Sequence, residues 1–381
     1  EERVKKIVVI GPVYPYKGGI SHYTGLLYRA LCKTNKVEMV SYKMQYPHFL
    51  FKKEQKDYSN DKFRIEDTKF WLHTANPFNI VQTARKINKL KPDLVILQWW
   101  HPYFAPCYWI LTSFLRNTKV MFVCHNVFPH ERFPMDRLLT RIALSKGDGF
   151  ILHAESDVHE LQKIKKNARY KVTVHPTYNA FRLTGMGQKE AREKLGLSEE
   201  EKVLLFFGYV RPYKGLEYLL KAMPQICKKT ENIRLLVVGE FGDDREDYMR
   251  LIENLGIDDF LQCHEGYIPD KEVEKFFAAC DLVVLPYVSA TQSGIAQIAY
   301  GFEKPVLATN VGGLPDVVLD GKTGRLVAPG NPAALAEAVV DFFREDRREM
   351  YKKNIEEQAY RFSWDRMRET IDSFEWSEDE R

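Results

Sequence analysis

Residues 282–328 read LVVLPYVSATQSGIAQIAYGFEKPVLATNVGGLPDVVLDGKTGRLVA, and this stretch decides the fold. Its apolar run Leu282–Pro286 is typical of a strand buried on both faces of a parallel sheet. A turn of small polar residues follows, and then a helix that must stop before Pro305. A second apolar strand, Val306–Thr309, completes a strand–helix–strand unit. Such a unit indicates an α/β protein with a doubly wound parallel sheet.

The same alternation of short apolar runs and longer helical patterns fills most of the chain, with one break near Lys171–Ser198. A charged helix, Gln188–Leu195, opens the second half, and Ser363 is the expected N-cap of a last helix. We therefore expect two open sheets, each with its ligand site at the carboxyl ends of the strands. The other predicted strands are Lys6–Ile10, Val37–Ser41, Leu94–Gln98, Val120–Cys124, Gly149–His153, Val203–Phe207 and Leu235–Gly239.

Composition excludes several classes of protein. The 381 residues suffice for two or three domains, and 45% apolar with 28% charged residues is typical of a globular chain. No apolar run approaches the roughly 18–20 residues of a membrane-spanning helix, and the N-terminus does not read as a signal peptide. The six cysteines include no C-x-x-C pair, which argues against a disulfide scaffold or a structural zinc site. We expect a cytoplasmic protein, or one on the inner face of a membrane.

Charge is divided unevenly along the chain. Residues 1–180 carry 29 Lys and Arg against 15 Asp and Glu, or +14, and the remainder carries 27 against 37, or −10. The basic half could meet a phosphate-bearing acceptor or an anionic lipid surface; two solvated surfaces of opposite sign explain the charge equally well. Aromatic and basic side chains occur together in residues 44–53 and 99–109. These segments could dock on a membrane interface or line a pocket for a lipid-linked acceptor, or they could simply form the core and rim of the first domain. No nucleic-acid-binding module is present, and we expect no such partner.

Candidate site residues in the first half follow two predicted strands. Gly18 and Gly19 precede a helix that begins near Ser21, where backbone N–H groups can approach an anion. The spacing is not G-x-G-x-x-G, so the dinucleotide fingerprint is absent. His125 stands at the carboxyl end of a strand, where α/β sheets keep their functional residues. His130 and Glu131 follow on its loop, and His153 is a weaker candidate at the end of the next strand.

In the second half, residues 206–216 read FFGYVRPYKGL and place Arg211 and Lys214 between a strand and a helix. Two cations in that position suit a diphosphate, although a solvated pair is the alternative. Ser289, Thr291, Gln292 and Ser293 crowd the start of a later helix, where polar groups could bind a sugar phosphate or merely cap the helix. The chain has no metal-binding or nucleophile motif and no D-x-D triplet. We expect neither a metal nor a cofactor.

At these residues the chain resembles glycosyltransferase family 4, over nearly its whole length. The resemblance rests on GGI at 18–20, HN at 125–126, GYVRPYKGLEYLLKA at 208–222, LLVVGE at 235–240 and KPVLATNVGGLPDVVLDGKTGRLV at 304–327. It implies the GT-B fold: two Rossmann-like domains facing across a cleft, with a C-terminal helix crossing back to the first. Residues 1–178, together with helix 364–381, would bind the acceptor. Residues 179–363 would bind the nucleotide-sugar donor.

The resemblance also implies an activity and site residues. The protein would be a retaining, metal-independent glycosyltransferase of hexosyltransferase type, moving a sugar from a nucleoside-diphosphate sugar to a glycan, glycolipid or other hydroxyl acceptor in glycan biosynthesis. Arg211, Lys214 and His125 would be catalytic. The residues implied to bind the donor are Gly18, Gly19, Gly239, Tyr267, Ile268, Thr291, Gln292, Ser293, Gly294 and Gln297. Those implied for the acceptor are His22, His130 and Glu131.

One part of the family's pattern is missing. The family commonly has E-x7-E in the window that is Ala290–Ala299 here, and this chain has Gln292 and Gln297 but no glutamate. Amides can still hydrogen-bond sugar hydroxyls, so activity is compatible with the change. Two alternatives remain on the same scaffold: a nucleotide-sugar epimerase or glycan phosphorylase, and a non-catalytic glycan- or lipid-binding relative. A nicotinamide oxidoreductase is disfavoured because the glycine fingerprint is absent.

Overall fold

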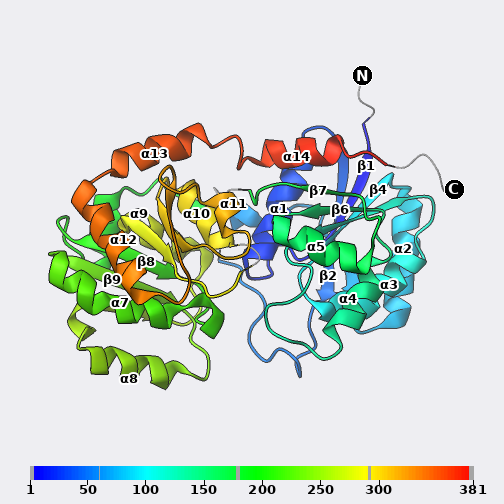
Figure 1. Ribbon diagram of the computed structural model, residues 1–381. Coiled ribbons are helices and arrows are strands. Elements are labelled where there is room, and N and C mark those ends of the chain that lie inside the picture. The colour runs from blue at the N-terminus through cyan, green and yellow to red at the C-terminus, as the bar shows by residue number, and fades with distance from the viewer. Residues whose placement is uncertain (1–3, 60, 177–180, 291–292, 377–381) are drawn as a thin grey trace. The chain divides into compact units, whose positions relative to one another are not determined.

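The computed structural model describes residues 4–59, 61–176, 181–290 and 293–376 (Figure 1). The chain divides into two units of similar size. The first contains the residues up to Val174 and those from Ser363 onward, and the second contains His175–Phe362. Each is built on a parallel sheet, which confirms the prediction of two α/β domains. Within the described residues, no helix combines the length and apolarity needed to cross a membrane.

The first unit has a seven-stranded sheet in the order β3-β2-β1-β4-β5-β6-β7. Its central strands are almost wholly buried, because helices cover both faces. The strands are β1 (Lys6–Ile10), β2 (Lys36–Met44), β3 (Lys69–His73), β4 (Leu94–Trp99), β5 (Lys119–Cys124), β6 (Gly149–Leu152) and β7 (Tyr170–Val172). The helices are α1 (Gly19–Leu31), η1 (Asp61–Phe63), α2 (Pro77–Leu90), η2 (Pro102–Phe104), α3 (Ala105–Ser113), α4 (Asp136–Leu144), α5 (Glu155–Ile164) and α14 (Trp364–Asp372).

The last helix, α14, packs on α1 of the first unit. Ser363 accepts a hydrogen bond from the Arg366 amide, which confirms the predicted N-cap. The ring of Trp364 meets that of Tyr23 edge to face at 4.9 Å. Lys33 pairs with Asp365 at 2.8 Å. These contacts make the end of the described chain part of the first unit.

The second unit has a six-stranded sheet in the order β10-β9-β8-β11-β12-β13. Its strands are β8 (Lys202–Phe207), β9 (Ile233–Gly239), β10 (Leu261–Glu265), β11 (Leu282–Leu285), β12 (Val306–Thr309) and β13 (Gly324–Val327). Its helices are α6 (Gln188–Leu195), η4 (Pro212–Lys214), α7 (Leu216–Lys229), α8 (Arg245–Leu255), η5 (Asp258–Phe260), α9 (Asp270–Ala279), α10 (Gly294–Gly301), α11 (Leu314–Val317), α12 (Pro332–Glu345) and α13 (Arg348–Glu357).

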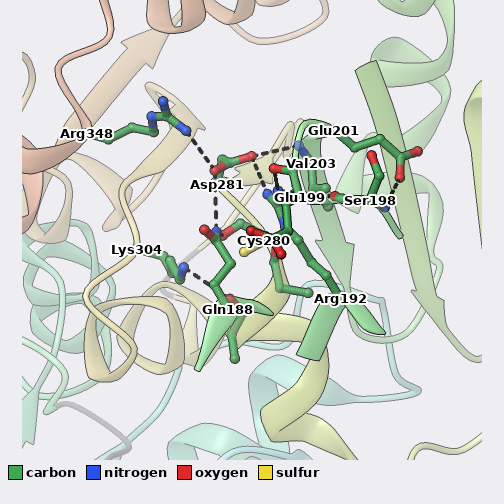
Figure 2. Close-up of polar contacts among 12 residues, drawn as sticks. Gln188, Arg192, Ser198, Glu199, Glu201, Val203, Cys280, Asp281, Lys304 and Arg348 are labelled. Atoms are coloured by element: carbon green, nitrogen blue, oxygen red, sulfur yellow. Dashed lines mark hydrogen bonds and ion pairs between the residues drawn. The ribbon is translucent and has the colours of Figure 1, made fainter. Parts of the chain in front are cut away.

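A buried ion pair ties α6 to the sheet of the second unit. Figure 2 shows Arg192 of α6 reaching Asp281, with 2.9 Å between Nη2 and Oδ2. Arg192 also donates from Nε to the Ala279 carbonyl, and Asp281 accepts from the Val203 amide at 2.8 Å. Both side chains are more than nine-tenths buried. The additional hydrogen bonds satisfy the two charges, which would otherwise be costly to keep from water.

Both strand orders contain a point where the chain changes direction across the sheet. In the first unit this point lies between β1 and β4, and in the second it lies between β8 and β11. In open sheets of this kind the loops after the two adjoining strands leave toward opposite faces, and the place between those loops at the carboxyl edge, called the crevice below, is where ligands bind. The first crevice is bounded by the segments after Ile10 and Trp99, and the second by those after Phe207 and Leu285.

Candidate functional site

Lys214 is the central side chain of the second crevice. After β8 the chain passes Gly208, makes the short helix η4 and turns back at Gly215. Lys214 thereby folds over Gly208: its Nζ lies 3.1 Å from where a Cβ at residue 208 would be. The ammonium also lies 5.9 Å from the centre of the Tyr287 ring, which follows β11. Lys214 thus spans the two loops that bound the crevice.

Arg211 lies close enough to Lys214 for the two charges to interact. Burial, with a smaller contribution from the neighbouring Arg211 guanidinium, lowers the pKa of Lys214 to about 8. Arg211 sits at the N-cap of η4 and extends toward Gly242 after β9. Among the described residues, Lys214 forms no ion pair with a carboxylate. Two repelling cations, both half-buried, create a site that an anion would stabilise.

The turn after β9 approaches this site because residue 239 is glycine. Gly239 has a φ of +147°, and a Cβ there would lie 1.8 Å from the Gly208 carbonyl oxygen. No other residue could be accommodated without moving one of the loops. The Gly266 amide donates to the Gly239 carbonyl at 3.0 Å, which brings Tyr267 and Ile268 to the same edge of the sheet. These three predicted donor residues are therefore neighbours.

The N-terminus of α10 lies on the other side of Lys214. Ile295 Cδ1 is 3.8 Å from the Cβ position of Gly208, so the first turn of α10 borders the crevice. Ser293 precedes Gly294 at the helix start, and its hydroxyl lies 3.3 Å from the Tyr287 hydroxyl. Gln297 is fully buried within α10. The predicted residues Thr291 and Gln292 lie outside the described residues.

In the first unit, His125 is held by a residue that the sequence analysis missed. Its Nε2 lies 2.7 Å from Oε1 of Gln98, the side chain near the end of β4. Gln98 packs against the loop after β1, since a Cβ at Gly11 would lie 2.6 Å from Gln98 Cγ. Burial, with a smaller contribution from His153, lowers the pKa of His125 well below its ordinary value. At neutral pH the ring is uncharged and can exchange hydrogen bonds but cannot supply a positive charge.

Tyr23 of α1 joins His125 to His153. It meets the His125 ring edge to face at 4.5 Å, and its hydroxyl lies 2.7 Å from His153 Nε2. His153 Nδ1 lies 2.7 Å from the Thr173 carbonyl oxygen, so Nδ1 must carry the proton. Nε2 then accepts from Tyr23. Burial lowers the pKa of His153 to about 4. This arrangement makes His153 a support for Tyr23 and His125.

The remaining predicted residues occupy two places in the first unit. Gly18 is exposed with a φ of +101° and is the N-cap of α1, which begins at Gly19. His22, on the next turn, is buried and its ring centre is 3.9 Å from that of Phe63, so it faces the interior of the unit. His130 and Glu131 lie on the exposed loop after β5. Glu131 acts on the pKa of His101, which places it toward η2.

Comparison with known proteins identifies both halves of the chain. The family model described as glycosyl transferases group 1 matches residues 187–361, and the model of the starch synthase catalytic domain matches residues 6–191. D-inositol 3-phosphate glycosyltransferase of Segniliparus rotundus is 30% identical over 239 residues, which is 61% of this chain and 53% of that protein. An uncharacterized glycosyltransferase of Methanocaldococcus jannaschii is 31% identical over 189 residues, 48% of this chain and 47% of that one. The chain spans about half the length of the curated relatives it matches.

Solved structures extend the similarity of fold to almost the whole chain. Sucrose-phosphate synthase from Thermosynechococcus elongatus gives a TM-score of 0.72 at 19% identity, covering 96% of this chain and 97% of that one. Anabaena HepE in complex with UDP-glucose gives 0.73 at 17% identity, covering 97% and 100%. At such identities the likeness concerns the fold, and it matches the two parallel-sheet units described above. The second half of the chain, residues 187–361, therefore matches the group 1 glycosyltransferases, and the chain as a whole has the GT-B fold.

Proposed function

We propose that this protein transfers a sugar from a nucleoside-diphosphate sugar to a hydroxyl acceptor, with retention of configuration and without a metal ion. The observation that carries the proposal is the position of Lys214, half-buried beside Arg211 at the mouth of the β8–β11 crevice. Departure of a nucleoside diphosphate from the anomeric carbon places negative charge on a phosphate oxygen. Fixed cations and the N-terminus of α10 can stabilise that charge.

The donor would lie across the second unit. Gly239, Tyr267 and Ile268 form the turns expected to surround the nucleoside, and Arg211 and Lys214 would neutralise the diphosphate. Structural neighbours of this fold are known in complex with UDP and with UDP-glucose, which supports a nucleotide-sugar of this class here. Metal independence is proposed because two side-chain cations already occupy the position at which a divalent ion would act.

The first unit would bind the acceptor. Gly18 and Gly19 expose the N-terminus of α1, where backbone N–H groups and the helix dipole favour an anionic group such as a phosphate. The names of the relatives include inositol 3-phosphate, an acceptor with such a group. The uncharged ring of His125 would bind a hydroxyl of the reacting sugar. Retention would follow if the acceptor hydroxyl attacks from the face that the diphosphate leaves, passing its proton to the departing phosphate oxygen.

We also propose that the first unit makes peripheral contact with an anionic membrane. From Lys69 to His130, both included, the chain has seven Lys and Arg residues and one acidic residue, Asp93. Attraction of this kind weakens with ionic strength, because salt screens exposed charges. Binding to anionic vesicles should therefore fall between 50 mM and 500 mM salt, conditions chosen to bracket a Debye length of about 10 Å. Binding that salt leaves unchanged would contradict an electrostatic contact.

The experiment that tests the proposed reaction is a thermal-shift screen of nucleotide-sugars followed by a product assay. A true donor raises the melting temperature by mass action. The selected donor is then incubated with and without candidate acceptors, and the sugar products are identified. Transfer to an acceptor with the anomeric configuration kept supports the proposal. Conversion of the donor sugar into its epimer without acceptor, or no stabilisation by any nucleotide-sugar, would contradict it.

A further inference from the structure

A pocket of about 370 Å³ lies among the first turns of the helices on one face of the first unit. In Figure 1 the helices α2, α3 and α4 lie side by side, and α2 packs on α3 and α3 on α4. Four stretches of chain line the pocket: 47–50, 74–80, 102–110 and 133–139. Its volume falls within the range of sites that hold small organic molecules. No residue predicted for donor or acceptor binding lines it.

The wall of this pocket is apolar. The two hydroxyl groups in it, those of Thr74 and Tyr103, are 2.8 Å apart, and Thr74 donates to the Gln45 carbonyl at 2.7 Å. Tyr103 must therefore donate to Thr74, which leaves neither hydroxyl with a proton for a ligand. An occupant would gain chiefly from burying hydrocarbon. The apolar side chains in the wall include Phe49, Leu50, Ile80, Ile110, Phe133 and Leu139.

Large apolar side chains also surround the pocket on the outer surface. Phe49 and Leu50, at its edge, are 75% and 52% exposed, and Phe78 at the start of α2 is 88% exposed. Of the fifteen exposed large apolar side chains among the described residues, eleven belong to the first unit and four to the second. Exposed large apolar side chains gathered around one pocket are typical of a surface that binds a partner. Four more such side chains lie in the same part of the chain: Phe51, Trp109, Met135 and Leu138.

The charged residues beside the pocket wall are of both signs with a small basic excess: Lys52, Lys53, Arg132 and Arg137 against Glu54, Glu131 and Asp136. Lys52 follows the exposed apolar residues 49–51, and Arg132 and Arg137 lie on either side of Phe133. All three are exposed, and none forms an ion pair within the described part of the chain. Helix α2, whose first turn lines the pocket, carries three basic residues farther along, Arg85, Lys86 and Lys89, and no acidic one. Exposed apolar side chains with an excess of nearby cations are typical of surfaces that insert between anionic lipid headgroups.

We propose that this pocket takes one acyl chain of a lipid in an anionic bilayer leaflet and so fixes the first unit to the membrane surface. The rim aromatics would enter the headgroup region, the cations would pair with lipid phosphates, and one chain would leave the leaflet for the pocket. The inference rests on the proposed membrane contact and deepens it. It does not rest on the sugar-transfer reaction, because the pocket and the β8–β11 crevice belong to different units.

Ala75 offers a variant that separates chain binding from surface adsorption. It lines the pocket and is exposed, so a larger side chain there meets no packed core. Ala75→Phe fills the pocket while adding apolar surface outside it, whereas Ala75→Ser leaves the space open. Binding is measured by co-sedimentation with vesicles of equal parts phosphatidylglycerol and phosphatidylcholine. We expect Ala75→Phe to bind about tenfold more weakly than wild type, the factor that burial of about two methylene groups supplies.

Ala75→Ser should bind like the wild-type protein. A second variant, Leu50→Gln, removes apolar surface at the mouth without changing charge, and it should also weaken binding. Equal or tighter binding by Ala75→Phe would overturn the acyl-chain site and leave only adsorption by charge. Absence of wild-type binding to these vesicles would overturn both the site and the membrane contact. The rise in melting temperature with nucleotide-sugar is measured in parallel for the wild-type protein and each variant. Absence of wild-type vesicle binding with this rise intact contradicts the lipid site and the membrane contact but not the reaction, whereas absence of the rise in the wild-type protein contradicts the proposed reaction.

Discussion

Protonation of Lys214 should control the affinity of the protein for its nucleotide-sugar. In the free protein, burial and the Arg211 charge hold the pKa of this ammonium at about 8, below its ordinary value of 10.5. A bound diphosphate would favour the charged form and return the pKa toward that value. The difference, 10.5 minus 8, corresponds to about 3 kcal/mol at 1.36 kcal/mol per pKa unit.

The sign of the pH dependence follows directly. Below pH 8 most free molecules already carry the ammonium, so the full affinity is present. As the pH rises above 8, the free protein loses the proton and binding must recover it. At pH 9 roughly one molecule in eleven retains the charge, so affinity should be about tenfold lower than at pH 7. Calorimetric titration in buffers of different ionisation enthalpy should then show uptake of nearly one proton at pH 9.

Lys214→Arg is the matched control, because its guanidinium stays charged throughout this range. Any titration of the nucleotide itself affects both proteins alike, so the difference between their pH profiles belongs to residue 214. The variant should bind with little change between pH 7 and pH 9. Identical profiles for wild type and Lys214→Arg, or a flat wild-type profile, would refute the assignment of this side chain to the diphosphate.

Four further outcomes are expected. Asp281→Ala should destabilise the second unit by about 3–5 kcal/mol in denaturant unfolding, because it leaves Arg192 buried without its carboxylate; a change below 1 kcal/mol would contradict this. Gly239→Ala should lower donor affinity at least tenfold in calorimetry, since its Cβ would clash with the Gly208 carbonyl; unchanged affinity would show that the two loops separate easily. Gln98→Leu should lower kcat with little change in donor affinity, because His125 loses its hydrogen-bond partner. Gln98→Glu should shift the pH profile of kcat, because a carboxylate stabilises the charged form of His125. An unaltered kcat in both variants would show that Gln98 does not position His125 for the reaction. Treatment with chelator should leave turnover unchanged, and strict dependence on added Mg²⁺ would overturn the role given to the two cations.

The central strands of both sheets were predictable because almost all of their residues are apolar. Lys6–Ile10 is found at the expected bounds, and the strand expected at Leu94–Gln98 ends one residue later. Strands at or near the sheet edges escaped prediction. β10 reads LQCHE and β7 has only three residues, because a strand with one neighbour or one solvated side need not be apolar.

The candidate site was predictable to the extent that it depends on sequence position. Arg211, Lys214 and His125 all follow the strands that the apolar pattern located. The contact between Gln98 and His125 was not predictable, since it joins residues from different strands through the order of the sheet. The only available signal was the place of Gln98 as the last residue of a predicted strand. The fold of Lys214 over Gly208 likewise depends on the turn at Gly215, whose conformation the sequence permits but does not dictate.

Transfer of a labelled sugar by the Arg211→Ala and Lys214→Ala variants tests most directly whether this cation pair stabilises the leaving diphosphate. The rate under saturating donor and acceptor is compared with that of the wild-type protein, after circular dichroism has shown that each variant is folded. The account predicts that each variant loses at least about a hundredfold in kcat, as removal of one preorganised group that stabilises transition-state charge does elsewhere. Variants that turn over at the wild-type rate would contradict it.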